Sequence, residues 1–197
     1  MVLFGGDVAA GPFPHETIER LRALDARFVM GNADRTLIDG RLGSMFDWAT
    51  TQVDDADKEF LRSFEPSVVI DDVLYCHSTP HSDEDWITIL TPPALAEEIL
   101  GEVGHPLLVQ GHTHSQFDRR IGTTRVVNAG SVGMANAEEP GAYWLVVRDG
   151  VPEFRRTEYD PGPLRASGWP ILEEWLAERI LTPLTPRQAA EMVEARR

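Results

Sequence analysis

The sequence is poor in cysteine, in basic residues and in long apolar runs, and each shortage excludes a class of protein. The single cysteine, Cys76, excludes an internal disulfide framework and predicts a reducing, cytoplasmic compartment. The 18 Lys and Arg residues face 32 Asp and Glu residues, and the formal charge of −14 argues against nucleic-acid binding because it repels a phosphate backbone. No apolar run reaches the about 18 residues of a membrane-spanning helix, so no membrane association is expected.

The beginning of the sequence also lacks two features. It has neither a basic stretch nor a long apolar region, so no signal peptide is expected. It has no polar lead-in either, since the apolar run Val2-Leu3-Phe4 follows Met1 directly. The 197 residues suit one domain, because domains commonly have about 100–200 residues.

Four short apolar runs are each followed by a polar group, three of them after glycine, and this pattern is typical of buried strands with tight exits. The runs are residues 2–4 before Gly5-Gly6-Asp7, residues 27–30 before Gly31-Asn32, residues 73–76 before His77, and residues 107–110 before Gly111-His112-Thr113-His114. Helical patterns alternate with them: one begins at Pro14 with Ile18, Leu21 and Leu24 on one face, one is capped by Asp54, and one begins at Thr91-Pro92. The alternation predicts an α/β layered fold.

The pattern changes from about residue 117, where short strands are predicted over residues 117–121, 125–128, 143–147 and 151–156. Asp149-Gly150 is a strong hairpin signal, so this half is expected to be antiparallel. Helices are predicted over residues 169–180 and from Thr185, where Thr185 and Gln188 form a capping box. We expect a core domain over residues 1–160 and a C-terminal helical extension, residues 161–197, packed on it.

Polar side chains follow the predicted parallel strands, at the edge of the sheet where ligands bind in open α/β folds. They are Asp7, Asn32, His77, His112 and His114. Oxygen and nitrogen donors without thiolate suit Mn, Fe, Zn, Co or Ni better than a structural zinc site of the cysteine type. His112-Thr113-His114 can direct both imidazoles into one cavity, so a metal site is the sharper hypothesis.

Each of these residues also has an ordinary structural explanation. Asp and Asn after glycine are common turn residues, and a single His at a strand end usually serves a local hydrogen bond. His81 could lie at the rim of the site or in a solvated loop. The segment 128–133 could present backbone N–H groups to a phosphate or form only a tight turn. Because four apolar runs are all followed by a polar side chain, a shared site is favoured over a separate structural explanation for each residue.

The ordered motifs resemble those of the calcineurin-like metallophosphoesterases, especially the small bacterial and archaeal phosphodiesterase branch, over about residues 1–160. The motifs are Gly5-Gly6-Asp7, Gly31-Asn32-Ala33-Asp34, Cys76-His77-Ser78-Thr79-Pro80, Gly111-His112-Thr113-His114 and Asn128-Ala129-Gly130-Ser131-Val132-Gly133. The ordered set is much more specific than any single motif.

The resemblance implies a four-layer α/β/β/α sandwich with a site for two divalent metal ions, such as Mn, Fe, Zn or Ni. Asp7 would bridge the two ions, Asn32, His77 and His112 would complete one coordination shell, and His114 would bind the other ion. The implied activity is hydrolysis of small phosphate esters, as a phosphodiesterase or phosphatase, by a metal-bound hydroxide.

The sequence departs from the family pattern at its beginning, because the family's opening Asp-x-His motif is not found upstream of Asp7. We therefore expect the first strand and helix of the fold to be missing and the second metal site to be weak or empty. A start codon assigned too late would explain this. An open strand edge would be covered by residues outside the sequence or by a homo-oligomer, or it would leave the chain marginally stable.

Three smaller departures remove no ligand. Ala33 stands where many relatives place a leaving-group histidine, which the phosphodiesterase branch also lacks. Ser78 and Ala129 replace the usual Gly and Pro. The alternative to an enzyme is a non-catalytic scaffold or regulator, a role that a retromer subunit of this fold takes. The retained ligands favour the enzyme, and the missing opening motif favours the scaffold.

Overall fold

The computed structural model describes residues 1–42 and 46–197, and its strands form three sheets. The first is a parallel pair and the second a five-stranded mixed sheet, while the third is an antiparallel hairpin. Their strands, in spatial order, are β1 (Val2–Phe4) and β2 (Ala26–Phe28); β3 (Ser67–Ile70), β4 (Val73–Cys76), β5 (Leu107–Gln110), β7 (Thr124–Asn128) and β6 (Phe117–Ile121); and β8 (Ala142–Arg148) and β9 (Val151–Thr157).

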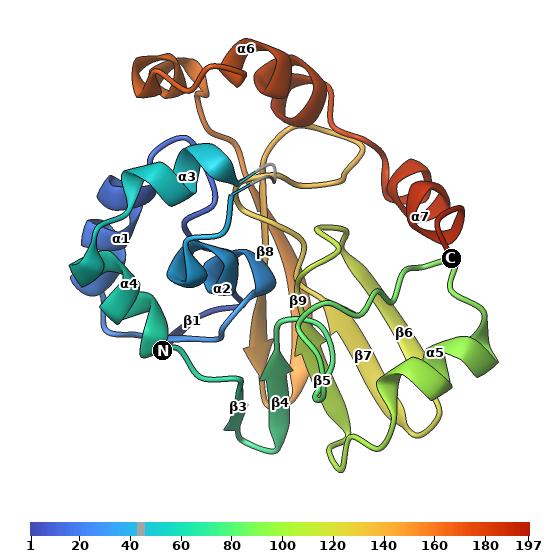
Figure 1. Cartoon of the computed structure of the whole chain (residues 1–197). Coiled ribbons are helices and arrows are strands. Elements are labelled where there is room, and N and C mark those ends of the chain that lie inside the picture. Colours follow the sequence, from blue (N-terminus) through green and yellow to red (C-terminus); the bar gives the residue numbers. More distant parts are fainter. Residues whose placement is uncertain (43–45) are drawn as a thin grey trace.

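Seven α-helices accompany these strands in the described ranges. They are α1 (Pro14–Arg22), α2 (Asn32–Asp39), α3 (Asp47–Gln52), α4 (Asp55–Arg62), α5 (Pro93–Leu100), α6 (Leu172–Trp175) and α7 (Pro186–Glu194). A 3-10 helix, Gly162–Ser167, and a π-helix, Leu176–Leu181, flank α6. Helices α1–α4 surround β1 on one side of the molecule, and α5 covers the opposite side (Figure 1). The predicted α/β class, with sheets between outer helices, is confirmed.

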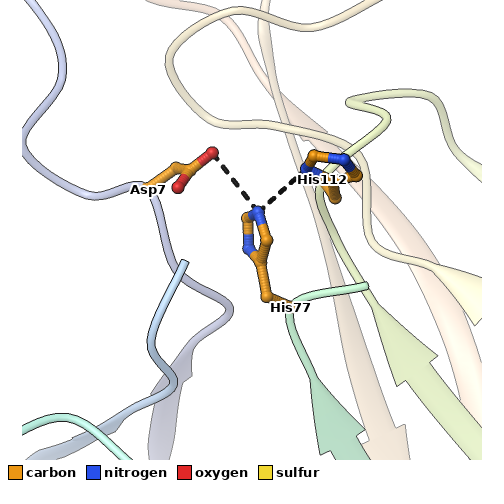
Figure 2. A group of neighbouring side chains, drawn as sticks. All are labelled: Asp7, His77 and His112. Carbon is orange, nitrogen blue, oxygen red and sulfur yellow. Dashed lines mark hydrogen bonds and ion pairs between the residues drawn. The ribbon is translucent and has the colours of Figure 1, made fainter. Parts of the chain in front are cut away.

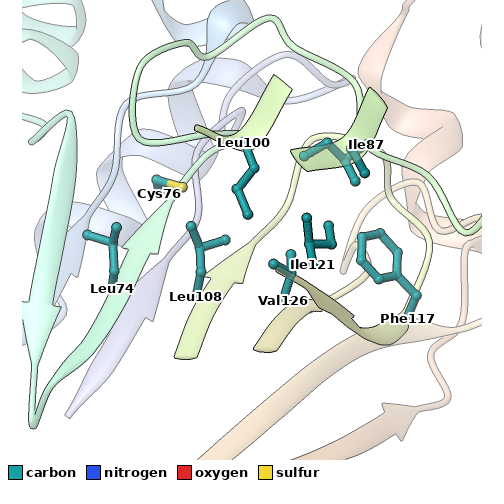
Figure 3. Close-up of a cluster of buried hydrophobic side chains, with 9 residues drawn as sticks. Leu74, Cys76, Ile87, Leu100, Leu108, Phe117, Ile121 and Val126 are labelled. Carbon is teal, nitrogen blue, oxygen red and sulfur yellow. The ribbon is translucent and has the colours of Figure 1, made fainter. Parts of the chain in front are cut away.

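Alternate residues along a strand point to opposite sides of the sheet, and in the central strands β4, β5 and β7 both sides carry buried side chains. Leu74, Cys76, Leu108 and Val126 pack with Leu100 of α5 on one face (Figure 3). Val73, Leu107, Val109 and Val127 face Leu145 and Val147 of β8 on the other. This double burial explains why these strands are continuous apolar runs in the sequence.

A second core lies between β2 and the helices α1–α4. Ile18, Leu37 and Leu61 are fully buried there. The ring of Phe28 stacks between Phe4 and Phe64, at centroid distances of 5.2 Å and 4.9 Å. This packing fixes the ends of β1 and β2, where two of the predicted site residues follow.

Several sequence-based predictions of element ends are confirmed. Pro14 begins α1, Asp54 accepts a hydrogen bond from the Asp57 N–H at the start of α4, and Thr185 caps α7 in the same way. The Asp149-Gly150 hairpin is present, with positive φ at both residues, as the tight turn requires.

Other predictions need correction. Leu24 does not continue the buried face of α1, because the helix ends at Arg22 and Leu24 is 48% exposed. The helix predicted over residues 169–180 is split into α6 and the π-helix. The second half is not wholly antiparallel, because β7 pairs antiparallel with β6 but parallel with β5.

The C-terminal elements contact α3 and the segment that precedes α5. Trp169, Leu172, Leu176 and Ile180 form a buried cluster that includes Trp48 of α3. The carboxylate of Glu194 on α7 accepts hydrogen bonds from Thr88 and Thr91. The division into residues 1–160 and 161–197 stays a prediction, as does a preceding strand and helix. None of the helices in the described ranges is long and apolar enough to cross a membrane.

Candidate metal centre

Four of the five predicted site residues meet beyond the carboxyl ends of β1, β2, β4 and β5. The Nε2 atom of His77 lies 3.1 Å from His112 Nδ1, 3.2 Å from Asn32 Oδ1 and 3.3 Å from Asp7 Oδ2. Figure 2 shows Asp7 approaching His77 from one side and His112 from the other. Strands of two different sheets therefore contribute donors to one point.

A backbone hydrogen bond orients the His77 ring. Its Nδ1 lies 2.7 Å from the carbonyl oxygen of Gly5, so Nδ1 must donate. In the neutral ring, Nε2 then carries a lone pair that points at Asp7, Asn32 and His112. A histidine whose outer N–H is held by a carbonyl is the common arrangement of a metal ligand.

Burial and charge set the protonation of the cluster. Burial raises the pKa of Asp7, but the hydrogen bond and charge of His77 outweigh it and the net direction is downward. Burial lowers the pKa of His77, but Asp7 outweighs it and the net direction is upward. Burial, together with the charge of His77, lowers the pKa of His112 to about 4. His112 is therefore neutral at pH 7, as a metal ligand must be.

The backbone around the cluster adopts an unusual conformation. Asp7, His112 and His114 have φ values of 58°, 60° and 58°, in the left-handed region that residues other than glycine rarely enter. Gly6 has φ 94°, and a Cβ there would lie 2.6 Å from His77 Nδ1. Such conformations collect at functional sites, where surrounding contacts hold them.

Asp34 is the main residue that the sequence analysis left without a role. Its fully buried carboxylate accepts hydrogen bonds from the backbone N–H groups of Asp7 (2.7 Å), Val8 (2.9 Å) and Gly31 (3.0 Å). Burial and the charge of Asp7 raise the pKa of Asp34 to about 7. Asp34 thus holds the loop that carries Asp7, and its place after Gly31-Asn32-Ala33 was the only available signal.

His114 lies beside this cluster rather than in it. Burial lowers the pKa of His114 against the opposing effect of the Asp7 charge, and across residues 1–42 and 46–197 no hydrogen bond joins its ring to the side chain of Asp7 or His77. Its carbonyl oxygen accepts a hydrogen bond from the Asn136 N–H at 2.9 Å. Its predicted place in a second metal shell stays a prediction.

The loop after β7 supports the His112 turn. Asn128 is fully buried, and its amide donates to the carbonyl of Gly111 and, at 3.0 Å, to Thr113 Oγ1. Two backbone N–H groups of the loop, those of Gly130 and Gly133, donate to Asn128 Oδ1 and Ser131 Oγ. The turn therefore already uses these groups, which favours the structural explanation of the segment over a phosphate nest.

The donors fit a divalent ion. Two ligands about 2.1 Å from one ion lie about 3.0–3.4 Å apart in octahedral or tetrahedral geometry, the range in which the site distances fall. Around His77 Nε2, the Asp7 and Asn32 oxygens can only accept and the neutral His112 ring offers its Nδ1. A single proton on His77 Nε2 could not be donated to Asp7, Asn32 and His112 at once. A cation among the four groups could accept a lone pair from each of them.

Comparison with known proteins bears on the family and the fold of the chain. Residues 1–149 match the profile of the calcineurin-like phosphoesterase superfamily domain. The fold is similar to that of a metallophosphoesterase from Sphaerobacter thermophilus, at 21% identity and a TM-score of 0.68 over 96% of this chain and 86% of that chain. It is also similar to a hypothetical protein from Pyrococcus horikoshii, at 20% identity and a TM-score of 0.70 over 88% and 79% of the two chains. A comparison with curated sequences finds no match.

Proposed function

The chain belongs to the calcineurin-like phosphoesterase superfamily, and on that premise we propose that it is a metal-dependent hydrolase of small phosphate mono- or diesters. The observation that carries the proposal is the convergence of Asp7, Asn32 and His112 on His77 Nε2, at 3.1–3.3 Å. A scaffold has no need of four such donors, two of which, Asp7 and His112, lie on backbone of positive φ.

In this proposal, Asp7, Asn32, His77 and His112 would hold one divalent ion, and Asp7 and His114 would provide ligands for a second, weaker site. A bound ion would acidify a water molecule and polarise the phosphate oxygens. The Gly5 carbonyl keeps the proton of His77 on Nδ1, away from the site, and Asp34 keeps the Asp7 carboxylate in place. Because position 33 is Ala33, this position supplies no acid to protonate the leaving group.

The identity of the metal and the size of the substrate belong to the same proposal. Mn, Fe, Zn or Ni would suit the oxygen and nitrogen donors, and the substrate would be a small ester rather than a long polyanion, since the chain carries a formal charge of −14. A cytoplasmic location and a homo-oligomer stay predictions.

Hydrolysis of bis-p-nitrophenyl phosphate in the presence of Mn tests the proposal. We expect His112→Ala to lower the rate at least about 100-fold, since removal of an outer contact alone costs 10–100-fold in such sites. His105→Ala is the matched control, because His105 pairs with Asp72 at 3.0 Å, away from the cluster. Equal rates in the parent and in His112→Ala would rule out chemistry at this site and favour the scaffold.

A further inference from the structure

An exposed tryptophan borders the candidate metal centre. The indole of Trp86 and the imidazole of His112 have centroids 4.2 Å apart, with ring planes inclined by 52°. Trp86 is 41% exposed and belongs to none of the buried clusters of the described residues. Its neighbour Ile87 is 1% exposed and lies in the buried cluster that contains Leu100 of α5 (Figure 3). The chain thus buries Ile87 and leaves the larger ring open to water.

The loop that carries Trp86 is fixed from three directions. The Arg35 guanidinium, on α2, donates to Asp83 at 2.8 and 3.0 Å and to Glu84 at 2.8 Å. The Ser78 hydroxyl donates to the carbonyl of Asp85. From the C-terminus, Arg197 donates to the carbonyl of Trp86 itself. An aromatic ring held in this way can bind a ligand without a large ordering cost.

We infer that Trp86 is a stacking surface that selects phosphate esters carrying a planar, uncharged aromatic ring. This inference rests on the proposed function, because the phosphate would bind beside His112 and the ring would then lie over Trp86. Stacking on an exposed aromatic side chain contributes most where the rest of the ligand is already anchored.

The charges around Trp86 indicate which part of a ligand can lie against it, a neutral ring or an anionic group. Asp83, Glu84 and Asp85 immediately precede Trp86, and Arg35 pairs with the first two. Arg197, which donates to the Trp86 carbonyl, is paired with Glu194 at 2.9 Å, so neither this cation nor Arg35 is free to receive a second phosphate or a carboxylate. A neutral ring meets no such repulsion, so an aryl group or a nucleobase fits this position better than a polyphosphate.

Binding of two matched anions tests the inference without relying on turnover. Phenylphosphonate and methylphosphonate carry the same charged group and differ only in the ring. By calorimetry on the Mn-loaded protein, we expect the phenyl compound to bind about tenfold more tightly than the methyl compound. Trp86→Ala should abolish this preference and leave methylphosphonate affinity unchanged, and Trp86→Phe should keep most of it.

The outcomes separate the two proposals. If both phosphonates bind and Trp86→Ala changes neither, the stacking role is wrong and the phosphoesterase proposal stands. If Trp86→Ala lowers Mn binding itself, Trp86 only packs against His112 and the inference is wrong. If neither compound binds the Mn-loaded parent, both proposals fail. The same binding comparison can be made between thymidine 5′-monophosphate and 2-deoxyribose 5-phosphate, which differ only in the base. Tighter binding of the thymidine compound would identify nucleotides as the ligand class.

Discussion

At the scale of single residues, the candidate site depends on backbone conformations that cost free energy. Asp7, His112 and His114 all have positive φ, and each such residue costs on the order of 1–3 kcal/mol. Buried side chains hold these conformations, because Asp34 binds the Asp7 backbone and Asn128 binds the loop around His112. The rest of the fold therefore stabilises the site geometry before any ligand binds.

Gly6→Ala tests this dependence on backbone geometry. At φ 94°, a new Cβ would lie 2.6 Å from His77 Nδ1 and 2.7 Å from the backbone nitrogen of Gly31. We expect the free energy of unfolding to fall by about 1–3 kcal/mol, because both strain and contact must be relieved. Mn affinity should fall at least about tenfold as His77 is displaced. Denaturant titration and calorimetry measure the two effects.

The control is Gly5→Ala, one position earlier. A Cβ at Gly5 meets nothing within 4 Å, and its carbonyl can still accept from His77. Near-equal losses in the two variants would contradict the geometric explanation.

The sequence predicts the donors better than their supports. Asp7, Asn32, His77 and His112 each follow a strand-like run, so a local pattern places them at one sheet edge. Asp34 and Asn128 act through hydrogen bonds to backbone groups that the fold alone brings near, the first across 27 residues to Asp7 and the second across 17 residues to Gly111. No spacing in the sequence reveals such distant hydrogen-bond partners.

At the scale of elements, the starts of helices are predicted more accurately than the pairing of strands. Pro14, Asp54 and Thr185 begin helices where expected, since capping involves neighbouring residues only. The strand β3 (Ser67–Ile70) was missed, and the parallel pairing of β7 with β5 was not foreseen. Both depend on partners distant in the sequence.

Glu194→Ala tests the attachment of α7 to the loop beside the site. The Glu194 carboxylate accepts from Thr88 Oγ1 at 2.8 Å and from Thr91 Oγ1 at 2.6 Å. Hydrogen bonds to a charged group contribute about 1.5–3 kcal/mol each when both groups are shielded, and part exposure of Glu194 lowers this. We expect faster amide exchange in residues 86–91 and in α7. Glu191→Ala, which removes only an exposed pair with Arg187, should leave the exchange unchanged.

The contact between α1 and α4 predicts a pH dependence. His15 Nδ1 lies 2.7 Å from Asp57, with Glu19 and Asp54 nearby, and the hydrogen bond and charge of Asp57 raise the pKa of His15 above 6.5. The stabilisation of the folded state by the His15–Asp57 pair is complete below the pKa of about 6.5 that His15 has in the unfolded chain. It is lost as the pH rises through the pKa of His15 in the folded state. His15→Asn should therefore destabilise the protein more at pH 6 than at pH 8.5.

Unfolding titrations at the two pH values measure this difference. His81→Asn is a suitable control, since His81 is exposed beside Gly101. A loss that is equal at both pH values, or larger at pH 8.5, would contradict the role of the charged pair. The ligand atoms of His15, Asp54 and Asp57 all lie within 4.8 Å of one another, as in a metal site, but Arg22 lies 3.2 Å from Asp57 and supplies the positive charge there.

At the scale of the whole molecule, charge and site act together. The formal charge of −14 raises the local concentration of cations, and the cluster around His77 offers them a place where carboxylate, amide and imidazole donors converge. A bound ion would offset repulsion among buried groups, so metal binding and folding stability are expected to be linked.

Thermal unfolding with and without Mn tests this linkage. At a free Mn concentration about 100 times the dissociation constant, one bound ion stabilises the folded state by about 2.7 kcal/mol. For a chain of this size, that corresponds to a rise in Tm of about 5–10 °C. Metal analysis after gel filtration should find about one retained ion per chain, because four donors converge at His77 whereas His114 lies apart from them. His112→Ala should lose both the rise and the retained ion, while His105→Ala keeps both. A rise that is equal in the parent and in His112→Ala would show that Mn binds elsewhere on the acidic surface.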